Sequence, residues 1–428
     1  MQLLSSRRWR AAAASAAVLG LMLTGCTAED TFTYTPPAQV DGPIADDTVA
    51  AMQAAVDNAL VASGASGAVV GVWVPWSGSW VTGVGTQGRE GEPLDTDMSF
   101  RVADVTRLMT CDVLYALADR GTVELDAAVT DYVSGVADMA DSGITLLDLC
   151  NGTSGVGSSE QRVAPAWLNT PERVWAPLEL AGYGLGSERV APHTTYRDSD
   201  AGYLLLGLAL ERASGMSASE LIAEYVTDPL DLPNTSLPGV AAAPPSSGPV
   251  VNGYYLNPVE GGYDCAAPVD ITVLSSSSGF TDSGAVSTID DLGRYVQAEA
   301  KQVLRTKETP DRFAAPLPMS PDAPSWYQGT GGAILVGSMI GQGGWTPGYA
   351  TAAYSDPATG FTVAVVLNDS TAGAAFAQWL SWELAAIASK APAADGQTAP
   401  EFGLPFTAEQ YHQMIADNAL PCVAPPAE

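Results

Sequence analysis

The chain has 428 residues, of which 46% are apolar and 15% are charged, a composition that argues against general disorder. Its length leaves room for one large domain or two small ones with a sizeable core. Eighteen Lys and Arg residues oppose 48 Asp and Glu residues, so the net charge is −30. A surface this acidic repels nucleic acid and anionic lipid headgroups, so we expect no nucleic-acid partner.

The first 26 residues have the organisation of an export signal. Arg7, Arg8 and Arg10 form a basic start, and residues 11–23 are apolar but too few to span a bilayer as a stable helix. The apolar stretch ends in the letters LTGC, whose last residue is Cys26, and this resembles the bacterial lipobox. The resemblance implies a cleaved signal peptide and a lipid on Cys26. The protein would then be anchored on the outer face of the bacterial cytoplasmic membrane. The alternative is an ordinary signal peptide with a chance cysteine.

Loss of the leader would remove three basic residues and no acidic one, leaving 15 basic against 48 acidic residues and a net charge of −33. No later segment is apolar over a length that predicts a transmembrane helix. Residues 27–45 are rich in Thr, Pro and acidic residues, which predicts a tether.

The rest of the chain alternates between strand and helix patterns. Apolar residues at helical spacing predict a helix over residues 46–61, with Asp46 and Asp47 as cap candidates. Residues 104–230 are predicted to be mostly helical, most clearly at 203–213. Strands are predicted at residues 68–74, 80–84, 332–336, 350–354 and 361–367.

Residues 238–262 have the Pro and Gly clusters of a loop, and a last long helix is predicted at 374–388. Strands therefore bracket a helical insert. This order predicts an α/β (α+β) sandwich, in which one antiparallel sheet is flanked by terminal helices and stands beside an all-helical subdomain. The predicted domain covers residues 46–390, and a Pro-rich tail with a short helix near 408–418 covers 391–428.

Several segments together resemble the serine β-lactamase and penicillin-binding protein family, which includes class C β-lactamases and DD-carboxypeptidases. They follow the family's order over about residues 68–388. The resemblance implies the β-lactamase/transpeptidase-like fold. The segments that carry it are residues 100–107, 114–133, 144–155, 198–211, 284–292 and 341–349.

Members of that family acylate a Ser that opens a helix in the pattern Ser-x-x-Lys, so that the Lys lies one turn further on. A Tyr-x-Asn motif relays protons, and a Lys or His in a third motif assists near the incoming carboxylate. This chain departs at every one of these positions. The positions are held by Asp104 for Ser, Arg107 for Lys, Asp198 for Tyr, Asp200 for Asn and Gln342 for Lys or His, while Gly344 is retained.

The replacements remove the family's chemistry. Arg107 stays protonated at any relevant pH and cannot serve as the base that Lys can be. Asp198 lacks a phenolic proton, and attack by Asp104 on an amide would give an anhydride. We therefore predict no catalytic residues and no cofactor, and we expect a pseudoenzyme whose ligand cleft is formed by Asp104, Arg107, Asp198, Asp200, Gln342, Gly344 and Trp345.

The expected partner is a peptidoglycan fragment or an envelope protein, besides the membrane itself. One alternative is a hydrolase of altered mechanism, either Asp-based or with a metal held by Asp104, Asp198 and Asp200. The second alternative is a structural surface lipoprotein without a ligand. In that case the charges of the old site would pair with one another, Asp104 with Arg107 first. His193 is expected to be an ordinary surface residue, and His412 lies in the predicted tail.

Four cysteines follow the leader, an even number that suggests two disulfides in an exported protein. Three pairings are open. We favour Cys111 with Cys150, because the family resemblance places both near the active-site helix, and therefore Cys265 with Cys422. The oligomeric state is left open.

Overall fold

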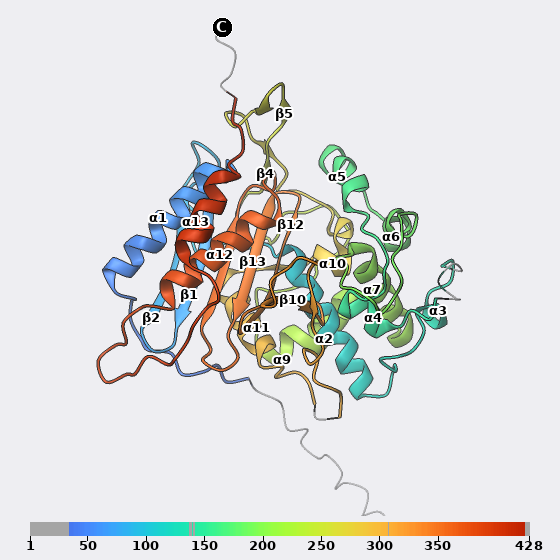
Figure 1. Ribbon diagram of the computed structural model, residues 1–428. Coiled ribbons are helices and arrows are strands. Elements are labelled where there is room, and N and C mark those ends of the chain that lie inside the picture. The colour runs from blue at the N-terminus through green and yellow to red at the C-terminus, as the bar shows by residue number, and fades with distance from the viewer. Residues whose placement is uncertain (1–33, 137–138, 140–141, 307, 424–428) are drawn as a thin grey trace, which may run out of the picture. The chain divides into compact units, whose positions relative to one another are not determined.

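An eight-stranded antiparallel sheet built from both ends of the chain is the central element of the fold (Figure 1). The computed structural model describes residues 34–136, 139, 142–306 and 308–423. The strand order is β2-β1-β14-β13-β12-β11-β10-β9. The strands are β1 Gly67–Val74, β2 Gly78–Gly85, β9 Leu317–Pro318, β10 Tyr327–Thr330, β11 Ala333–Val336, β12 Met339–Thr346, β13 Tyr349–Ser355 and β14 Thr362–Leu367.

Side chains alternate between the two faces of this sheet, so each face has its own core. Along β1, Val70 and Val72 point into one core and Val69 points into the other. Strands β13 and β14 are buried along their whole length because both faces are covered. The antiparallel sheet that the sequence predicts is confirmed.

Three helices from the two ends of the chain cover one face of the sheet (Figure 1). They are α1 Asp46–Ser63, α12 Ala374–Ala388 and α13 Ala408–Asp417. Asp46 and Asp47 lie inside the first turn of α1, where acidic side chains favour the helix dipole, and the N-cap is Ala45 instead. The capping role expected for the two aspartates is therefore wrong.

The other face packs against α11 and the helical half. The core between them is the larger of the two cores. The helices here are α2 Thr106–Asp119, α3 Val129–Tyr132, α4 Leu146–Asn151, α5 Glu160–Asn169, α6 Pro177–Leu185, α7 Asp200–Ser214, α8 Ala218–Ile222, α9 Asp228–Leu230, α10 Phe280–Ser283 and α11 Ile289–Ala300. Short turns of tighter or wider helix are η1 Ala103–Val105, η3 Ala223–Thr227 and η4 Ser276–Ser278.

In the described part of the chain, three short two-stranded sheets lie outside the main sheet. They are β3 Phe100–Arg101 with β8 Val286–Ser287, β4 Tyr254–Tyr255 with β7 Val269–Asp270, and β5 Pro258–Val259 with β6 Gly262–Tyr263. Two of these strands fall in the segment 238–262, for which the sequence indicates only loop.

The described parts of the predicted tether (residues 27–45) and of the predicted tail (residues 391–428) both pack against the domain. Tyr34 and Ile44 are buried before α1. After α12, Phe406, Tyr411 and Ile415 enter the core that α1 and α12 share with the sheet. None of the helices in the described part of the chain has the length and apolar character needed to cross a membrane.

Candidate active-site cleft

A tight turn places Asp104 at the start of α2. The turn η1 links β3 to this helix, and its first residue, Ala103, has φ of 49°, in the left-handed region that a residue with a Cβ seldom adopts. One helical turn beyond Asp104 the guanidinium of Arg107 returns toward it, with Nη2 3.1 Å from the Asp104 Oδ2. The ion pair expected between these two residues is confirmed.

Arg107 is the centre of the site, because each of its three guanidinium nitrogens meets a different carboxylate. Nη2 pairs with Asp104, Nη1 donates a short hydrogen bond to Asp198, and Nε donates to Asp282 Oδ1 at 2.7 Å. The guanidinium also lies over the ring of Tyr203, 4.9 Å from its centroid. Burial works against the charge of Arg107, yet the carboxylates outweigh it and raise the pKa of Arg107 well above its ordinary value.

One guanidinium cannot neutralise this many carboxylates. Burial raises the pKa of Asp104 well above its ordinary range, and three neighbouring carboxylates add to the effect that Arg107 opposes. Burial likewise raises the pKa of Asp282 to about 6. The result is a crowded acidic site in which burial and the neighbouring carboxylates oppose the ionisation of Asp104 while Arg107 favours it.

Asp282 is a member of the site that the motif pattern does not reveal. It belongs to α10, whose first residue Phe280 also has a left-handed backbone, with φ of 42°. The only available signal is its position two residues before the family-like segment 284–292.

Asp200 is not among the residues that line the cleft, although the sequence places it with Asp104 and Asp198 in the lining. It is the first residue of α7, is only 3% exposed, and accepts a hydrogen bond from the Ser159 backbone N–H at 2.7 Å through Oδ1. Its Oδ2 is buried and has no hydrogen-bond partner among the described residues.

Strand β12 forms the opposite wall. The Gln342 side-chain amide donates to the Gly332 carbonyl at 2.7 Å and accepts from the Gly343 N–H at 2.9 Å. Both ends of this amide are therefore hydrogen-bonded to backbone groups. Gly344 allows the strand to approach α2, since a Cβ on it would lie 2.0 Å from Cγ of Asp104. Gly344 therefore shapes the site without lining the cleft.

Glu160, a second residue that the motifs do not reveal, closes the cleft from the helical half. It opens α5, and its Oε1 accepts a short hydrogen bond from the indole N–H of Trp345. Burial raises the pKa of Glu160 to about 7, with contributions from Asp198 and Asp200, while the Trp345 hydrogen bond opposes the shift. The ring of Trp345 also packs edge-on against Trp167 of α5, with centroids 6.5 Å apart.

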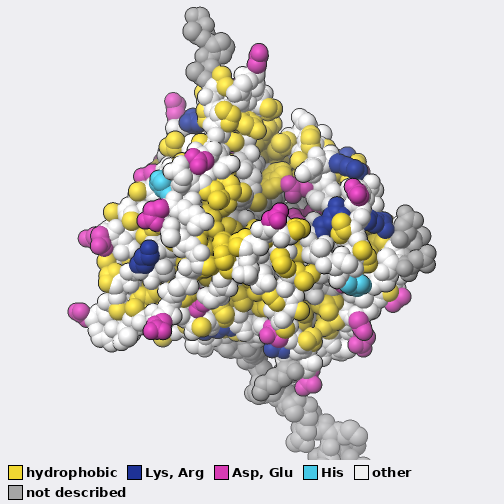
Figure 2. Space-filling view, viewed as in Figure 1, with side chains coloured by type: hydrophobic (Ala, Val, Ile, Leu, Met, Phe, Trp, Pro, Cys, Tyr) yellow, Lys and Arg dark blue, Asp and Glu magenta, His cyan; other side chains and the backbone are white. Residues whose placement is uncertain are grey.

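A cleft of about 310 Å³ lies over this cluster. In Figure 2 hydrophobic and acidic side chains gather around the hollow between the helices that cover the sheet and the helical half. Asp104, Arg107, Asp198 and Gln342 line it as the sequence predicts, and so does Trp345. The other lining residues are Glu160, Tyr196, Met319, Tyr327, Ile334, Gly343, Ala374 and Gln378.

The residue types in this lining decide what the site can do. No Ser, Cys or Lys occurs among the described residues that line the cleft. The Ser nucleophile and the Lys base on which the family's acyl transfer depends are therefore absent from the described lining. The described part of the chain also holds no group of three or more His, Cys, Asp or Glu arranged to bind a metal ion. Asp104 and Asp198 instead face Arg107, while Asp200 faces Ser159.

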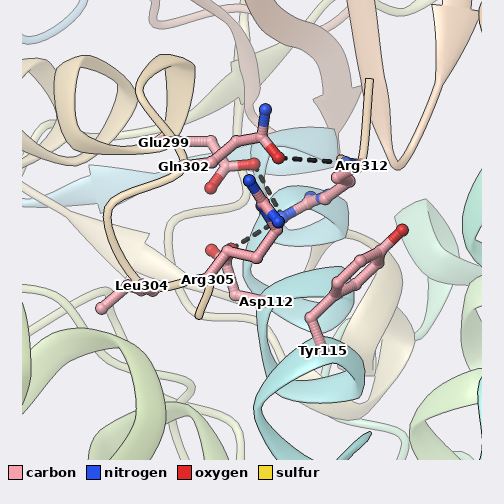
Figure 3. A pocket seen from close by; sticks show the side chains of 7 residues that line it. All are labelled: Asp112, Tyr115, Glu299, Gln302, Leu304, Arg305 and Arg312. Atoms are coloured by element: carbon pink, nitrogen blue, oxygen red, sulfur yellow. Dashed lines mark hydrogen bonds and ion pairs between the residues drawn. The ribbon is translucent and has the colours of Figure 1, made fainter. Parts of the chain in front are cut away.

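A second buried ion-pair network holds α2 from another side (Figure 3). Arg312 Nη1 lies 2.7 Å from Asp112 of α2 and 2.7 Å from Glu299 of α11. Arg312 also donates to the carbonyl of Leu108 at 2.9 Å, and Tyr295 donates to Asp112 at 2.7 Å. The small cavity beside these side chains measures about 10 Å³, so the network is structural and fixes the helix that carries Arg107.

Both disulfides favoured by the sequence are present. Cys111 of α2 bonds to Cys150 of α4, and Cys265 bonds to Cys422, with Cα atoms 5.7 and 5.4 Å apart. Cys26 lies outside the described residues.

The two histidines make structural contacts away from the cleft lining. His193 Nδ1 lies 2.8 Å from Asp148, which caps α4, and His412 Nδ1 lies 2.9 Å from Glu383 of α12. Both histidine side chains are about half exposed, and for His193 this confirms the predicted surface position.

An antiparallel sheet beside a helical half, with a cleft between the start of α2 and strand β12, is the arrangement of the β-lactamase/penicillin-binding protein fold. The family model described as Beta-lactamase matches residues 46–386, most of the chain. The protein therefore belongs to the β-lactamase family.

Curated relatives match only in part. The D-alanyl-D-alanine-carboxypeptidase/endopeptidase AmpH of Escherichia coli (strain K12) is 31% identical over 148 residues, which are 33% of this chain and 37% of AmpH. The esterase/beta-lactamase LipL of Mycobacterium tuberculosis (strain ATCC 25618 / H37Rv) is 26% identical over 186 residues, which are 42% of this chain and 38% of LipL. The matched region thus spans little more than a third of these relatives.

Solved structures are similar over a larger share of the chain. A D-stereospecific amidohydrolase from Streptomyces sp. has 24% identity and a TM-score of 0.65, covering 75% of this chain and 94% of its own. An octameric penicillin-binding protein homologue from Pyrococcus abyssi has 19% identity and a TM-score of 0.65, covering 79% and 76%. At this identity the similarity establishes the fold.

Proposed function

We propose that this protein is a catalytically inactive member of the β-lactamase family that binds a cell-envelope ligand or partner in its cleft. The observation that carries the proposal is the state of Arg107. It occupies the position of the family's lysine base, is 2% exposed, and is held by three carboxylates. An arginine so held stays charged and neither accepts nor relays a proton.

The open cleft supports a binding role over a purely structural one. If the charged residues at the motif positions only stabilised the fold, their ion pairs would fill the cleft. Instead, about 310 Å³ remains beside Asp198, whose side chain is 54% exposed. This volume is at the lower end of the range of small-molecule sites. A peptidoglycan fragment or a segment of an envelope protein is the ligand we propose.

The test is covalent labelling of the folded protein with a fluorescent penicillin, beside turnover of nitrocefin, a D-Ala-D-Ala peptide and a simple ester. An active family member is the positive control, and Asp104→Asn is the matched variant. We expect no stable labelling and no turnover above the Asp104→Asn background. Hydrolysis-resistant labelling, or turnover that Asp104→Asn abolishes, would show that the protein is an enzyme.

Anchoring through Cys26 is part of the same proposal and is supported by the leader sequence. Mass spectrometry of the N-terminal peptide from membranes should find diacylglycerol on Cys26. The Cys26→Ala variant should leave the membrane fraction. A wild-type protein that is exported without a lipid would contradict the anchoring and leave the cleft proposal untouched.

A further inference from the structure

The cleft offers an incoming ligand no free positive charge. Among the described residues of its lining, Arg107 is the sole Lys, Arg or His, and each of its guanidinium nitrogens already meets a carboxylate of the protein. An anionic ligand would therefore approach several carboxylates without gaining an ion pair. Such an approach is unfavourable in a partly buried site.

Acceptors, by contrast, are in excess. Asp198 is half exposed and uses Oδ1 for Arg107, while Glu160 shares the same lining. Asp200, the first residue of α7, is 3% exposed, and its Oδ2 has no partner among the described residues. A buried carboxylate oxygen without a donor is uncommon, and Asp200 adds to the negative potential at Glu160. These groups favour a ligand that brings both positive charge and N–H donors.

The walls are aromatic. Tyr196, Tyr327 and Trp345 line the cleft together with the apolar side chains of Met319 and Ile334. Burial raises the pKa of Tyr196 well above its ordinary value, so this ring stays neutral. Aromatic faces attract an ammonium group when it is partly desolvated. A small metal ion would not use such walls, whereas an organic cation would.

We propose that the cleft selects the ammonium group of an organic ligand, with Asp198 and Glu160 as its anionic partners and the aromatic walls around its carbon skeleton. This inference rests on the proposed binding function and adds the ligand class to it. It reverses the preference implied by the family resemblance, in which a cationic side chain of the third motif assists an incoming carboxylate. Gln342 is the residue at that position, and its side-chain amide is hydrogen-bonded to backbone groups.

Three probes with one phenylethyl skeleton test the inference: 2-phenylethylammonium, 2-phenylethanol and 3-phenylpropanoate. Binding to the full folded protein is measured by ligand-observed NMR and calorimetry at a pH above the pKa of about 7 of Glu160. We expect the ammonium probe to bind at least about tenfold more tightly than the alcohol, and the carboxylate more weakly than both. Equal binding of ammonium and alcohol, or tightest binding of the carboxylate, would overturn the inference.

Matched variants locate the binding. Asp198→Asn and Glu160→Gln each remove one charge and keep the shape of the side chain, and each should reduce the ammonium preference about threefold to tenfold. Glu90→Gln removes the same charge at an exposed position outside the cleft and should leave the preference unchanged. Circular dichroism checks each fold, and if Asp198→Asn does not fold, Glu160→Gln and Trp345→Leu carry the test. An ammonium preference that survives all cleft variants would place the binding elsewhere and overturn the inference.

The two proposals fail in different ways. Penicillin labelling or substrate turnover would overturn the proposed inactivity, whatever the probes show. An inert protein that binds the carboxylate probe best would overturn only the ligand class.

Discussion

Nε of Arg107 lies 2.7 Å from Oδ1 of Asp282, and the two side chains are 2% and 7% exposed. They are 175 residues apart in sequence, so this contact ties the start of α2 to α10. The same guanidinium reaches Asp198 just before α7. The position that the family resemblance assigns to a catalytic lysine is thus occupied by a cross-link between three segments of the helical half.

Removing this cross-link should destabilise the protein strongly. In Arg107→Met, the Asp104 and Asp282 carboxyls would stay buried without a cation. The expected loss is about 3–5 kcal/mol in the free energy of unfolding near neutral pH, which urea denaturation measures. The loss should shrink under mildly acidic conditions, where these carboxyls take up protons.

Arg173→Met is the matched control. Arg173 pairs with Glu179 at the surface and both side chains are 45% and 39% exposed, so its loss should cost at most about 1 kcal/mol. If both variants lost the same small amount, the buried ion pairs of Arg107 would have no structural role.

Restoring a serine alone should not restore an enzyme. In Asp104→Ser the hydroxyl would still face Arg107, which cannot take its proton, and Asp198 has no phenolic group to relay one. We expect no nitrocefin turnover and no stable penicillin labelling from this variant. Measurable acylation of Asp104→Ser would mean that another residue of the cleft acts as base.

The sequence predicts the fold and part of the site for a definite reason. Asp104, Arg107 and Asp198 lie in segments whose apolar framework still follows the family pattern, so their positions can be aligned although their chemistry has changed. Strands β13 and β14 and helix α12 are also predicted, because these segments are rich in apolar residues.

The missed features depend on contacts between distant segments. Glu160 meets Trp345 across 185 residues and Asp282 meets Arg107 across 175, and neither acid lies in a motif. The sequence does not predict strand β12, because glycines lower its strand propensity. The structure gives their reason: a Cβ on Gly341 would lie 2.0 Å from the Ala353 carbonyl oxygen of the neighbouring strand.

The raised pKa of Glu160 predicts a pH dependence with a definite sign. The group binds a proton more tightly in the folded protein, with a pKa of about 7, than at its ordinary value of 4.5. Its contribution to stability is therefore fully present below about pH 4.5 and falls as the pH rises to about 7, by roughly 3 kcal/mol at most. Glu160→Gln should remove this part of the pH dependence.

Urea denaturation of wild type and Glu160→Gln across this range measures the difference directly. Glu90→Gln, which is exposed, should follow the wild-type curve in shape. Parallel curves for Glu160→Gln and wild type would mean that Glu160 titrates normally in the folded protein.

The Cys265–Cys422 disulfide should stabilise the packing of the C-terminal segment. It closes a loop of 157 residues and joins the end of the chain after α13 to the β5–β6 hairpin region. Replacing both cysteines by Ser should cost about 2–5 kcal/mol in the free energy of unfolding. Non-reducing peptide mapping of the wild type should recover the 265–422 and 111–150 pairs. Four free thiols in the exported protein would contradict both disulfides.

The missing side chain of Gly344 should also matter for the stability of the site. A Cβ there would lie 2.0 Å from Cγ and 2.3 Å from Oδ1 of Asp104, so Gly344→Ala must push the carboxylate, and with it α2, away from β12. We expect a cost of about 1–3 kcal/mol in the free energy of unfolding.

In an Asp104→Gly background the carboxylate is gone, so the cost of the Gly344→Ala substitution should fall below about 1 kcal/mol. Gly182→Ala in α6, where a Cβ meets nothing within 4 Å, should be neutral or slightly stabilising. Equal costs of Gly344→Ala in both backgrounds would show that its effect does not come from Asp104, and that the approach of β12 to α2 is limited by other contacts.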